Sequence, residues 1–288
     1  MIAHYISLTK PRICLMVAIS TYLGYYLGIR YSGSYMTELS EWLVFSHLIV
    51  GTLFSCAGAC TLNQALEYKA DSKMERTKNR SIPKGELTPL QGIISGSFLS
   101  ILGIIYLALF VNTVVSILSL LTVFSYICLY TPLKKVSPLN TLVGAIPGAL
   151  PPVGGWFAVS QDFNLITVVL FSIMFCWQIP HFLSLAYMYS EDYTKGGFVM
   201  LPSLYSNQIQ TRIYVVFFTL LLVSITFALY FSTLVGISYL IFNMVLSVGF
   251  IYAVIKFTYS VNMDSARQLF FASIIYLPIL LLLIIISS

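Results

Sequence analysis

The sequence predicts an all-α, polytopic membrane protein with nine transmembrane helices. Of its 288 residues, 58% are hydrophobic and only 9% are charged, whereas a soluble domain carries about 25% charged residues. Nine apolar stretches each approach or exceed the ~20 residues that cross a bilayer. They lie near residues 13–29, 42–62, 90–111, 113–131, 139–159, 164–188, 213–231, 234–257 and 268–286. We therefore expect a single transmembrane domain over residues 1–288.

The basic residues predict the orientation of these helices. With a cytoplasmic N-terminus, 14 of the 15 Lys and Arg residues fall at cytoplasmic ends and loops, and only Arg30 falls outside. Cytoplasmic loops of membrane proteins carry such an excess, so the C-terminus is expected outside. The net charge of +5 follows from this topology, and no nucleic-acid partner is expected.

The first apolar segment is expected to be a retained helix. It follows the cluster Lys10-Pro11-Arg12 and has no small-residue cleavage site of the kind that ends a signal peptide. The sequence also has no Arg- and Ser-rich transit peptide. The expected location is a bacterial or archaeal plasma membrane.

A polar stripe ends the second apolar segment. Asn63, Glu67 and Asp71 recur every four residues, which on a helix places them along one face about 12 Å long. Hard oxygen ligands of this kind bind Mg²⁺ together with substrate phosphates. Arg76 and Arg80 follow, and arginine holds phosphate oxygens with its planar fork. A solvated helix end explains the basic residues but not Asn63, which lies where polar groups are costly and tend to be functional.

A second polar group ends the sixth apolar segment. Gln178 and His181 are three residues apart around Pro180, and Asp192 lies beyond them. Proline in a membrane helix frees backbone carbonyls, which is tolerated where they line a cavity. A structural, hydrogen-bonded His181 and a site residue are equally consistent with this pattern.

Tyr130 and Lys134 form a third group, one helical turn apart, where an aromatic face and a cation can share a cavity. An interfacial tyrosine with a topology-setting lysine is the alternative. The Gly- and Pro-rich run 144–156 predicts close helix contacts and a kinked segment, with room for a bulky ligand as a further reading. The five cysteines all lie inside apolar segments. Cys56 and Cys60 share a face, but no third soft ligand is near them in the sequence, so packing is favoured over metal binding.

Together these motifs resemble those of the UbiA-type intramembrane prenyltransferase superfamily. The matching pieces, in chain order over about residues 9–202, are Thr9-Lys10-Pro11-Arg12, Asn63-x3-Glu67-x3-Asp71-x2-Met74-x-Arg76-Thr77-x2-Arg80, Tyr130-Thr131-Pro132-Leu133-Lys134, Pro151-Pro152-x-Gly154-x-Trp156, Trp177-Gln178-x-Pro180-His181-Phe182, Asp192-Tyr193 and Met200-Leu201-Pro202. The pieces at 177–182 and 200–202 are similar to the branch that acts on haem, because other branches carry a second Asp-rich motif there.

The resemblance implies nine helices around a central cavity, with Mg²⁺ and the head group of farnesyl diphosphate at a cytoplasmic cap. It implies transfer of the farnesyl group to a vinyl group of haem B, with water addition to give haem O. The implied partners are farnesyl diphosphate, haem B, the lipid bilayer, and haem A synthase or terminal oxidase assembly factors.

Carried over position by position, the motifs imply four Mg²⁺ ligands: Asn63, Glu67, Asp71 and Asp192. The residues implied to bind diphosphate or haem are Arg12, Arg76, Arg80, Lys134, Gln178 and Lys195. The implied catalytic residues are Asp71, Tyr130, Lys134 and His181. Tyr130 would face the allylic cation, and His181 would orient water or the haem propionates. Glu67 departs from the family pattern, which usually has Asp there, and its longer arm shifts the metal.

Three alternatives remain at this point. A prenyltransferase of the same superfamily with a quinone or chlorin acceptor would carry most of the same motifs. A transporter would place polar residues near the bilayer midplane, whereas here they gather at one face. A haem-binding assembly subunit would need stable axial ligands, and three separate histidines give it poor support.

Overall fold

The computed structural model describes residues 1–160, 162–204, 207–232 and 235–288, and these residues form helices and no strands. The long helices are α2 (Pro11–Tyr31), α3 (Leu39–Asp71), α4 (Pro89–Phe110), α5 (Thr113–Phe124), α7 (Asn140–Phe157), α8 (Leu165–Met188), α11 (Ile209–Ala228), α12 (Ile237–Tyr259) and α13 (Met263–Ser287). The short helices are α1 (Ile2–Leu8), α6 (Thr131–Leu133), α9 (Ser190–Lys195) and α10 (Leu201–Leu204). A π-helix, η1 (Ser125–Tyr130), joins α5 to α6, and a 3₁₀ turn, η2 (Leu229–Ser232), extends α11.

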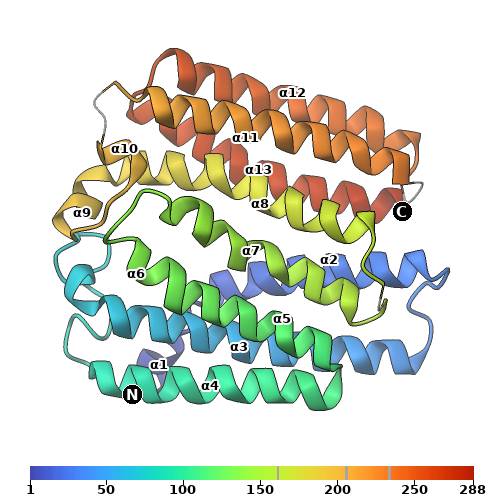
Figure 1. The fold of residues 1–288 in the computed structure, drawn as a ribbon, viewed down its shortest axis with the longest axis horizontal. Coiled ribbons are helices and arrows are strands. Elements are labelled where there is room, and N and C mark those ends of the chain that lie inside the picture. Colours follow the sequence, from blue (N-terminus) through green and yellow to red (C-terminus); the bar gives the residue numbers. More distant parts are fainter. Residues whose placement is uncertain (161, 205–206, 233–234) are drawn as a thin grey trace.

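The predicted all-α membrane architecture is confirmed. Each predicted apolar stretch corresponds to a helix, although residue 234, where the eighth stretch begins, lies outside the described residues. Within the described ranges, eight helices are long and apolar enough to cross a membrane. The remaining stretch is α7, an 18-residue helix with three interior prolines, and its Gly and Pro content lowers its hydropathy. At about 1.5 Å per residue α7 is about 27 Å long, and it lies among the spanning helices (Figure 1).

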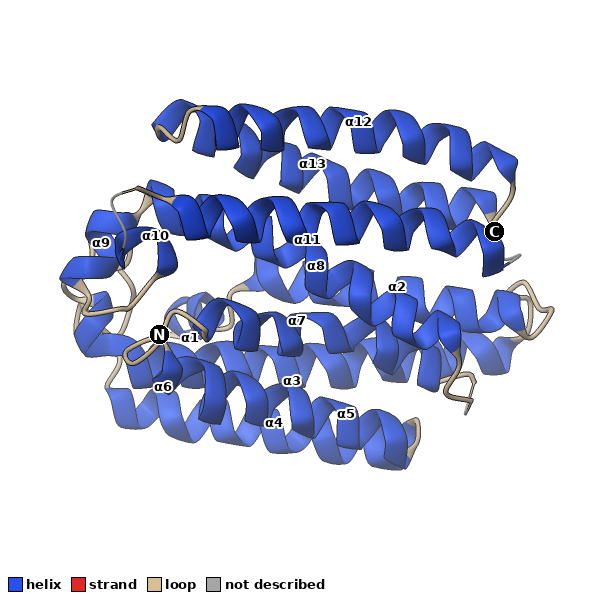
Figure 2. Cartoon of the chain, turned by 45° about the horizontal axis from the view of Figure 1, so that its top comes forward, coloured by secondary structure: helices blue, strands red, loops and turns tan. Residues whose placement is uncertain are grey.

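The long helices run side by side, and the two chain ends lie at opposite ends of the bundle (Figure 1). An odd number of membrane crossings places the two chain ends on opposite sides, so α7 counts as the ninth crossing. The short helices α1, α6, α9 and α10 gather at the end that holds the N-terminus (Figure 2). This end, together with the loop 72–88, forms a cap over the bundle.

The Gly- and Pro-rich run in α7 makes the close helix contact that the sequence predicts. A Cβ on Gly155 would collide with the backbone of Thr21, and a Cβ on Gly24 would collide with the backbone of Pro152. The helices α2 and α7 therefore touch backbone to backbone, as small residues permit in membrane bundles. This contact fixes α2, which carries part of the site, against α7.

Candidate active site

A cavity of about 760 Å³ lies inside the bundle, within the 300–1,000 Å³ range typical of ligand sites. Its wall is mostly apolar and is formed by α2, α3, α5 and η1 on one side and by α7, α8 and α13 on the other. The lining runs along α3 from Leu48 to Asp71, a separation of about 34 Å along the helix axis. The charged lining residues gather at the capped end, so the cavity has a polar head and long apolar walls.

The predicted stripe on α3 faces this polar head, and each of its three side chains contacts a cation through one oxygen. The side chains of Asn63, Glu67 and Asp71 are buried, with exposures of 2%, 5% and 1%. Lys134 Nζ donates to Glu67 Oε1 at 2.7 Å, and Arg80 donates to Asp71 Oδ2 at 2.7 Å. These pairings hold two buried carboxylates in place, and buried charges without partners would be costly.

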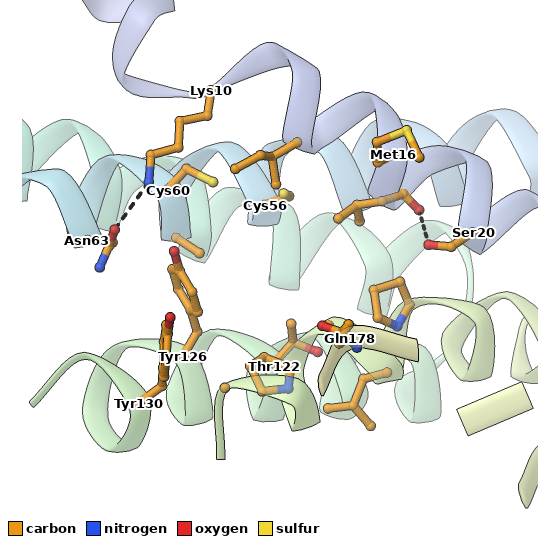
Figure 3. Close-up of a pocket in the computed structure, with 18 of the residues that line it drawn as sticks. Lys10, Met16, Ser20, Cys56, Cys60, Asn63, Thr122, Tyr126, Tyr130 and Gln178 are labelled. Carbon is orange, nitrogen blue, oxygen red and sulfur yellow. Dashed lines mark hydrogen bonds between the residues drawn. The ribbon is translucent and has the colours of Figure 1, made fainter. Parts of the chain in front are cut away.

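Lys10 is the third cation, and the fold around α1 positions it. Its Nζ donates to Asn63 Oδ1 at 3.2 Å (Figure 3). Gln64 donates to the carbonyl of Leu8 at 2.8 Å and so holds the end of α1. Lys10 has a φ of 50° directly before Pro11, a left-handed conformation that costs about 1–2 kcal/mol. The chain thus turns sharply between α1 and α2 and directs the ammonium group at the stripe.

The polar head carries an excess of positive charge. Among the described residues, five basic and two acidic side chains line the cavity. Burial lowers the pKa of Lys10 below its ordinary value, and the nearby cations Arg80 and Lys134 add to this effect. Burial alone would also lower the pKa of Lys134, but Tyr130 and the Glu67 carboxylate outweigh it and raise the pKa. An excess of cations around hard oxygens is suited to a metal-bound polyanion such as a diphosphate.

Tyr130 lies beside Lys134, as the sequence predicts. The Lys134 Nζ is 4.5 Å from the centroid of the Tyr130 ring and 5.5 Å from that of Phe198. The π-helix η1 ends at Tyr130, and π-turns in membrane helices often occur at functional sites. Tyr126, one turn earlier, points into the same cavity (Figure 3). A Cβ on Gly144 would collide with the Tyr130 ring, so this glycine makes room for the tyrosine.

Asp192 lies on α9, beside the cavity rather than in its wall. Its two carboxylate oxygens accept the backbone N–H groups of Glu75 and Arg76 at 3.2 and 3.1 Å. Arg76 lines the cavity, and its guanidinium lies over the rings of Tyr189 and Tyr193. In this geometry Asp192 positions the loop that carries Arg76, and its expected role as a metal ligand stays a prediction without geometric support.

Lys195 is exposed on α9 and does not line the cavity, whereas Arg12 reaches its rim. The expectation that Arg12, Arg76, Arg80 and Lys134 gather around one site agrees with the structure, and Lys195 falls outside that group.

Gln178 and His181 both line the cavity from α8. Gln178 donates to the carbonyls of Met174 and Ala145 at 2.9 and 3.3 Å. A Cβ on Gly148 would collide with its amide oxygen, so Gly148 makes room for this side chain. Gln178 thus bridges α8 and α7 at the cavity wall.

The surroundings of His181 define its hydrogen-bonding state. Its ring stacks between Trp177 and Phe270, each 4.9 Å away between centroids. Its Nδ1 lies 2.8 Å from Ser273 Oγ, and the Ser273 hydroxyl donates to the Phe270 carbonyl at 2.6 Å. With the single Ser273 hydroxyl proton directed at the Phe270 carbonyl, the tautomer with a proton on Nδ1 satisfies both bonds. The Nε2 atom is then left as a hydrogen-bond acceptor.

Sequence reasoning missed three contributors to this site. Lys10 was part of a matching motif but had no assigned role, and its contact with Asn63 spans 53 positions of the chain. Tyr126 lies four residues before Tyr130, and residues at i and i+4 share a helix face, so this spacing could have indicated it. Tyr193 had no predicted role beyond its place in the motif after Asp192. In the structure its hydroxyl accepts a hydrogen bond from Arg76 at 3.3 Å.

The residues present fit a magnesium ion by their donor chemistry. Mg²⁺ prefers oxygen ligands and binds through one or two carboxylates together with substrate phosphates. Glu67, Asp71 and the amide oxygen of Asn63 present hard oxygen donors along one face of α3. Their present partners are cations, which are themselves suited to phosphate oxygens.

The fold and this polar head define an intramembrane enzyme of the prenyl diphosphate type. The chain belongs to the UbiA prenyltransferase family, whose model matches residues 17–275. A curated relative from Solibacter usitatus, named protoheme IX farnesyltransferase, is 36% identical over 278 residues, which cover 96% of this chain and 95% of that protein. A relative of the same name from Aquifex aeolicus is 36% identical and covers 97% of this chain and 93% of that protein.

A solved structure supports the fold. A UbiA homologue from Archaeoglobus fulgidus bound to GPP and Mg²⁺ superposes with a TM-score of 0.62 at 15% identity, covering 98% of this chain and 99% of that one. At this identity the likeness concerns the arrangement of helices alone. The family assignment rests on the sequence matches.

Proposed function

We propose that this protein transfers the farnesyl group of farnesyl diphosphate to a vinyl carbon of haem B, with addition of water to give haem O. The observation that carries the prenyl transfer is the buried stripe of Asn63, Glu67 and Asp71 at the head of an apolar cavity, with one cation bound to each side chain. The haem acceptor is supported by relatives named protoheme IX farnesyltransferase at 36% identity over nearly the whole chain. The whole of residues 1–288 acts as one transmembrane domain in this proposal.

Asn63, Glu67 and Asp71 would hold Mg²⁺, which when bound supplies Lewis-acid stabilisation of the leaving diphosphate. Arg76, Arg80 and Lys134 bind the diphosphate oxygens and stabilise the charge that develops on them. The carbon–oxygen bond of the allylic diphosphate breaks, and the leaving oxygen takes the bonding electron pair. The apolar walls exclude water from the allylic cation, and the Tyr130 ring faces it.

The two sides of the cavity suit two different substrates. The side formed by α2, α3 and α5 is long and apolar, and it suits the farnesyl chain. The side formed by α8 and α13 carries His181, Phe270 and Leu277, and it suits the flat porphyrin. The vinyl carbon attacks the first carbon of the farnesyl group, and water then adds to the cation beside the ring and loses a proton to the solvent or to the released diphosphate. His181, with Nε2 as acceptor, orients that water or a haem propionate.

The positive-inside rule supports a cytoplasmic location for the capped end and an N-in, C-out topology in a bacterial or archaeal plasma membrane. The Arg30 side chain, the basic residue assigned outside, donates to the carbonyl of Ser288 at 3.0 Å at the far end of the bundle. Tagging of each terminus, followed by protease treatment of intact cells, tests this orientation. Handover of the product to haem A synthase or to terminal oxidase assembly factors is also part of the proposal, and cross-linking in membranes tests it.

The deciding experiment uses the full chain in proteoliposomes with haem B, Mg²⁺ and farnesyl diphosphate. The expected product has the mass of haem B plus a farnesyl group and a hydroxyl group, because the added water loses one proton. Asp71→Ala should lower the rate by at least about 100-fold, and a rate equal to wild type would refute the assigned role of Asp71. In parallel reactions that also contain a quinone precursor or a chlorin, prenylation of that compound with no change in haem mass would instead identify the other acceptor class.

A further inference from the structure

Three cysteine thiols meet in the wall of the cavity. Cys14 on α2 and Cys56 and Cys60 on α3 place their Sγ atoms within 4.8 Å of one another. The Sγ atoms of Cys14 and Cys56 are 3.5 Å apart. The sequence showed only the pair on α3, and the expectation that no third soft ligand lies near it is wrong. The close approach of α2 to α3 supplies the third thiol.

The spacing of these thiols fits one metal ion. Metal–sulfur bonds to Zn²⁺ are about 2.3 Å long, so three sulfurs around one ion lie about 3.8–4.0 Å apart. The observed sulfur positions are within a few tenths of an ångström to about 1 Å of that arrangement, which small side-chain rotations can supply. Thiolate ligands select soft ions such as Zn²⁺ and Cu(I) over Mg²⁺.

We propose that Cys14, Cys56 and Cys60 form a three-thiolate binding site for a soft, closed-shell metal ion, Zn²⁺ or Cu(I), in the cavity wall. This site is separate from the oxygen stripe and does not depend on the proposed haem acceptor. The two sites select different ions, because the stripe offers oxygen ligands and the cysteine cluster offers sulfur ligands.

An ion can reach the cluster from the cavity, and a nearby cation balances the charge of the bound ion with its three thiolates. Cys56 and Cys60 line the cavity, and Figure 3 shows them on the same wall as Lys10 and Asn63. Cys14 and Cys60 are buried, with exposures of 6% and 3%, so a bound ion would be shielded from water. The Lys10 ammonium group interacts electrostatically with Cys60, and it offsets the net negative charge of an ion held by three thiolates.

Binding is a proton exchange without redox change. Each sulfur–hydrogen bond breaks as a sulfur–metal bond forms, and three protons pass to the solvent. In the metal-free protein the Cys14 thiol donates to the carbonyl of Thr9 at 3.1 Å, and this bond is given up. Because Cys14 belongs to α2 and Cys56 and Cys60 belong to α3, metal binding ties α2 to α3 and frees the Thr9 carbonyl.

The test begins from a parent variant, C128S/C176S, which removes the two cysteines outside the cluster. The full chain in detergent, stripped of metal by a chelator, is titrated with Cd²⁺ as a spectroscopic probe. We expect an ultraviolet sulfur-to-metal charge-transfer band that saturates at one equivalent. Zn²⁺ and Cu(I) are then added in parallel titrations against a competing chelator, and at least one of them should displace Cd²⁺. The ion with the higher affinity is assigned to the site.

Each single change, C14S, C56S or C60S in the parent, should abolish the saturable one-equivalent band. A band that keeps its intensity and affinity in C14S would overturn the three-thiolate site, and so would the absence of any saturable band in the parent. Size-exclusion elution identical to that of the parent shows that each variant is folded.

A second measurement needs no variant within the cluster. In native membranes, Cd²⁺ should slow alkylation of Cys56 in the parent by at least about tenfold, because a metal-bound thiolate is not a free nucleophile. Intact mass after treatment with N-ethylmaleimide measures this rate. Equal alkylation with and without Cd²⁺ would overturn the proposal, whatever the outcome of the haem assay.

Discussion

Variants of the buried ion pair between Glu67 and Lys134 can distinguish the contribution of these residues to stability from their contribution to catalysis. The two side chains have exposures of 5% and 10%, and their charged atoms are 2.7 Å apart. In Glu67→Gln the size of the side chain is kept but the buried ammonium group loses its counter-charge. In Lys134→Met the buried carboxylate is left alone in the same way. The double variant removes both charges.

The structure sets the expected size of these effects. Breaking a buried ion pair costs about 3–5 kcal/mol, whereas replacing both partners by neutral groups is often close to neutral. The Tyr130 and Phe198 rings near Lys134 Nζ offset about 1 kcal/mol of the loss in Glu67→Gln. We therefore expect Glu67→Gln to lose about 3 kcal/mol of unfolding free energy and Lys134→Met about 4 kcal/mol, and the double variant to recover most of this loss.

Activity should follow a different order. Lys134 is proposed to bind the leaving diphosphate, and loss of one such group costs about 10²–10³ in kcat. Lys134→Met should lose this much, and the double variant should remain as inactive although its stability returns. Denaturant unfolding in detergent, followed by circular dichroism, measures the stability, and haem product formation measures kcat. Full turnover in the stable double variant would refute the catalytic role of Lys134.

The remaining predictions address the metal, the α9 contact and the apolar wall. Chelation of Mg²⁺ should stop turnover and its return should restore it, and Asp71→Asn should lower kcat by about 100-fold or more; turnover unaffected by chelation would contradict the metal site. Asp192→Ala should displace Arg76 and so raise the KM for farnesyl diphosphate about tenfold, with no change in the Mg²⁺ concentration required. A change in the required Mg²⁺ concentration would instead support Asp192 as a metal ligand. Ser119 lies in the apolar wall, with its Oγ 2.7 Å from Ser55 Oγ. Ser119→Phe should lower kcat/KM for farnesyl diphosphate about 10- to 100-fold and lower it less for the shorter geranyl diphosphate. Equal losses for both donors would exclude this wall as the binding site of the prenyl chain.

The membrane fold and the α3 stripe could be predicted from sequence because both depend on local periodicity. Apolar stretches of about 20 residues define spans, and positions 63, 67 and 71 repeat with the helix. The close packing of the Gly- and Pro-rich α7 was also predicted, although its prolines keep it out of the eight apolar spans, and the kink expected there stays a prediction. These features need no knowledge of which helices are neighbours.

The contacts between distant segments could not be predicted in the same way. The partner of Asn63 is Lys10, and the partner of the pair on α3 is Cys14; both depend on how α2 packs against α3. Asp192 carries the residue type of a metal ligand, but its carboxylate accepts backbone N–H groups from the loop after α3. Residue type alone does not distinguish a ligand from a group that holds a loop.

The pairing of every stripe side chain with a cation explains how these charges can be buried in the absence of a metal and a diphosphate. Lys134 and Arg80 neutralise the carboxylates of Glu67 and Asp71, and Lys10 contacts Asn63. When a metal-bound diphosphate enters, these cations can turn from the α3 oxygens to phosphate oxygens while the α3 oxygens turn to the metal. Partners are exchanged, and no buried charge is left alone, which avoids the main cost of such sites. The same reasoning predicts cooperation, because Mg²⁺ alone would leave the cations unpaired and diphosphate alone would leave the carboxylates unpaired. The longer arm of Glu67 serves this exchange, since it reaches Lys134 across the cavity from α3.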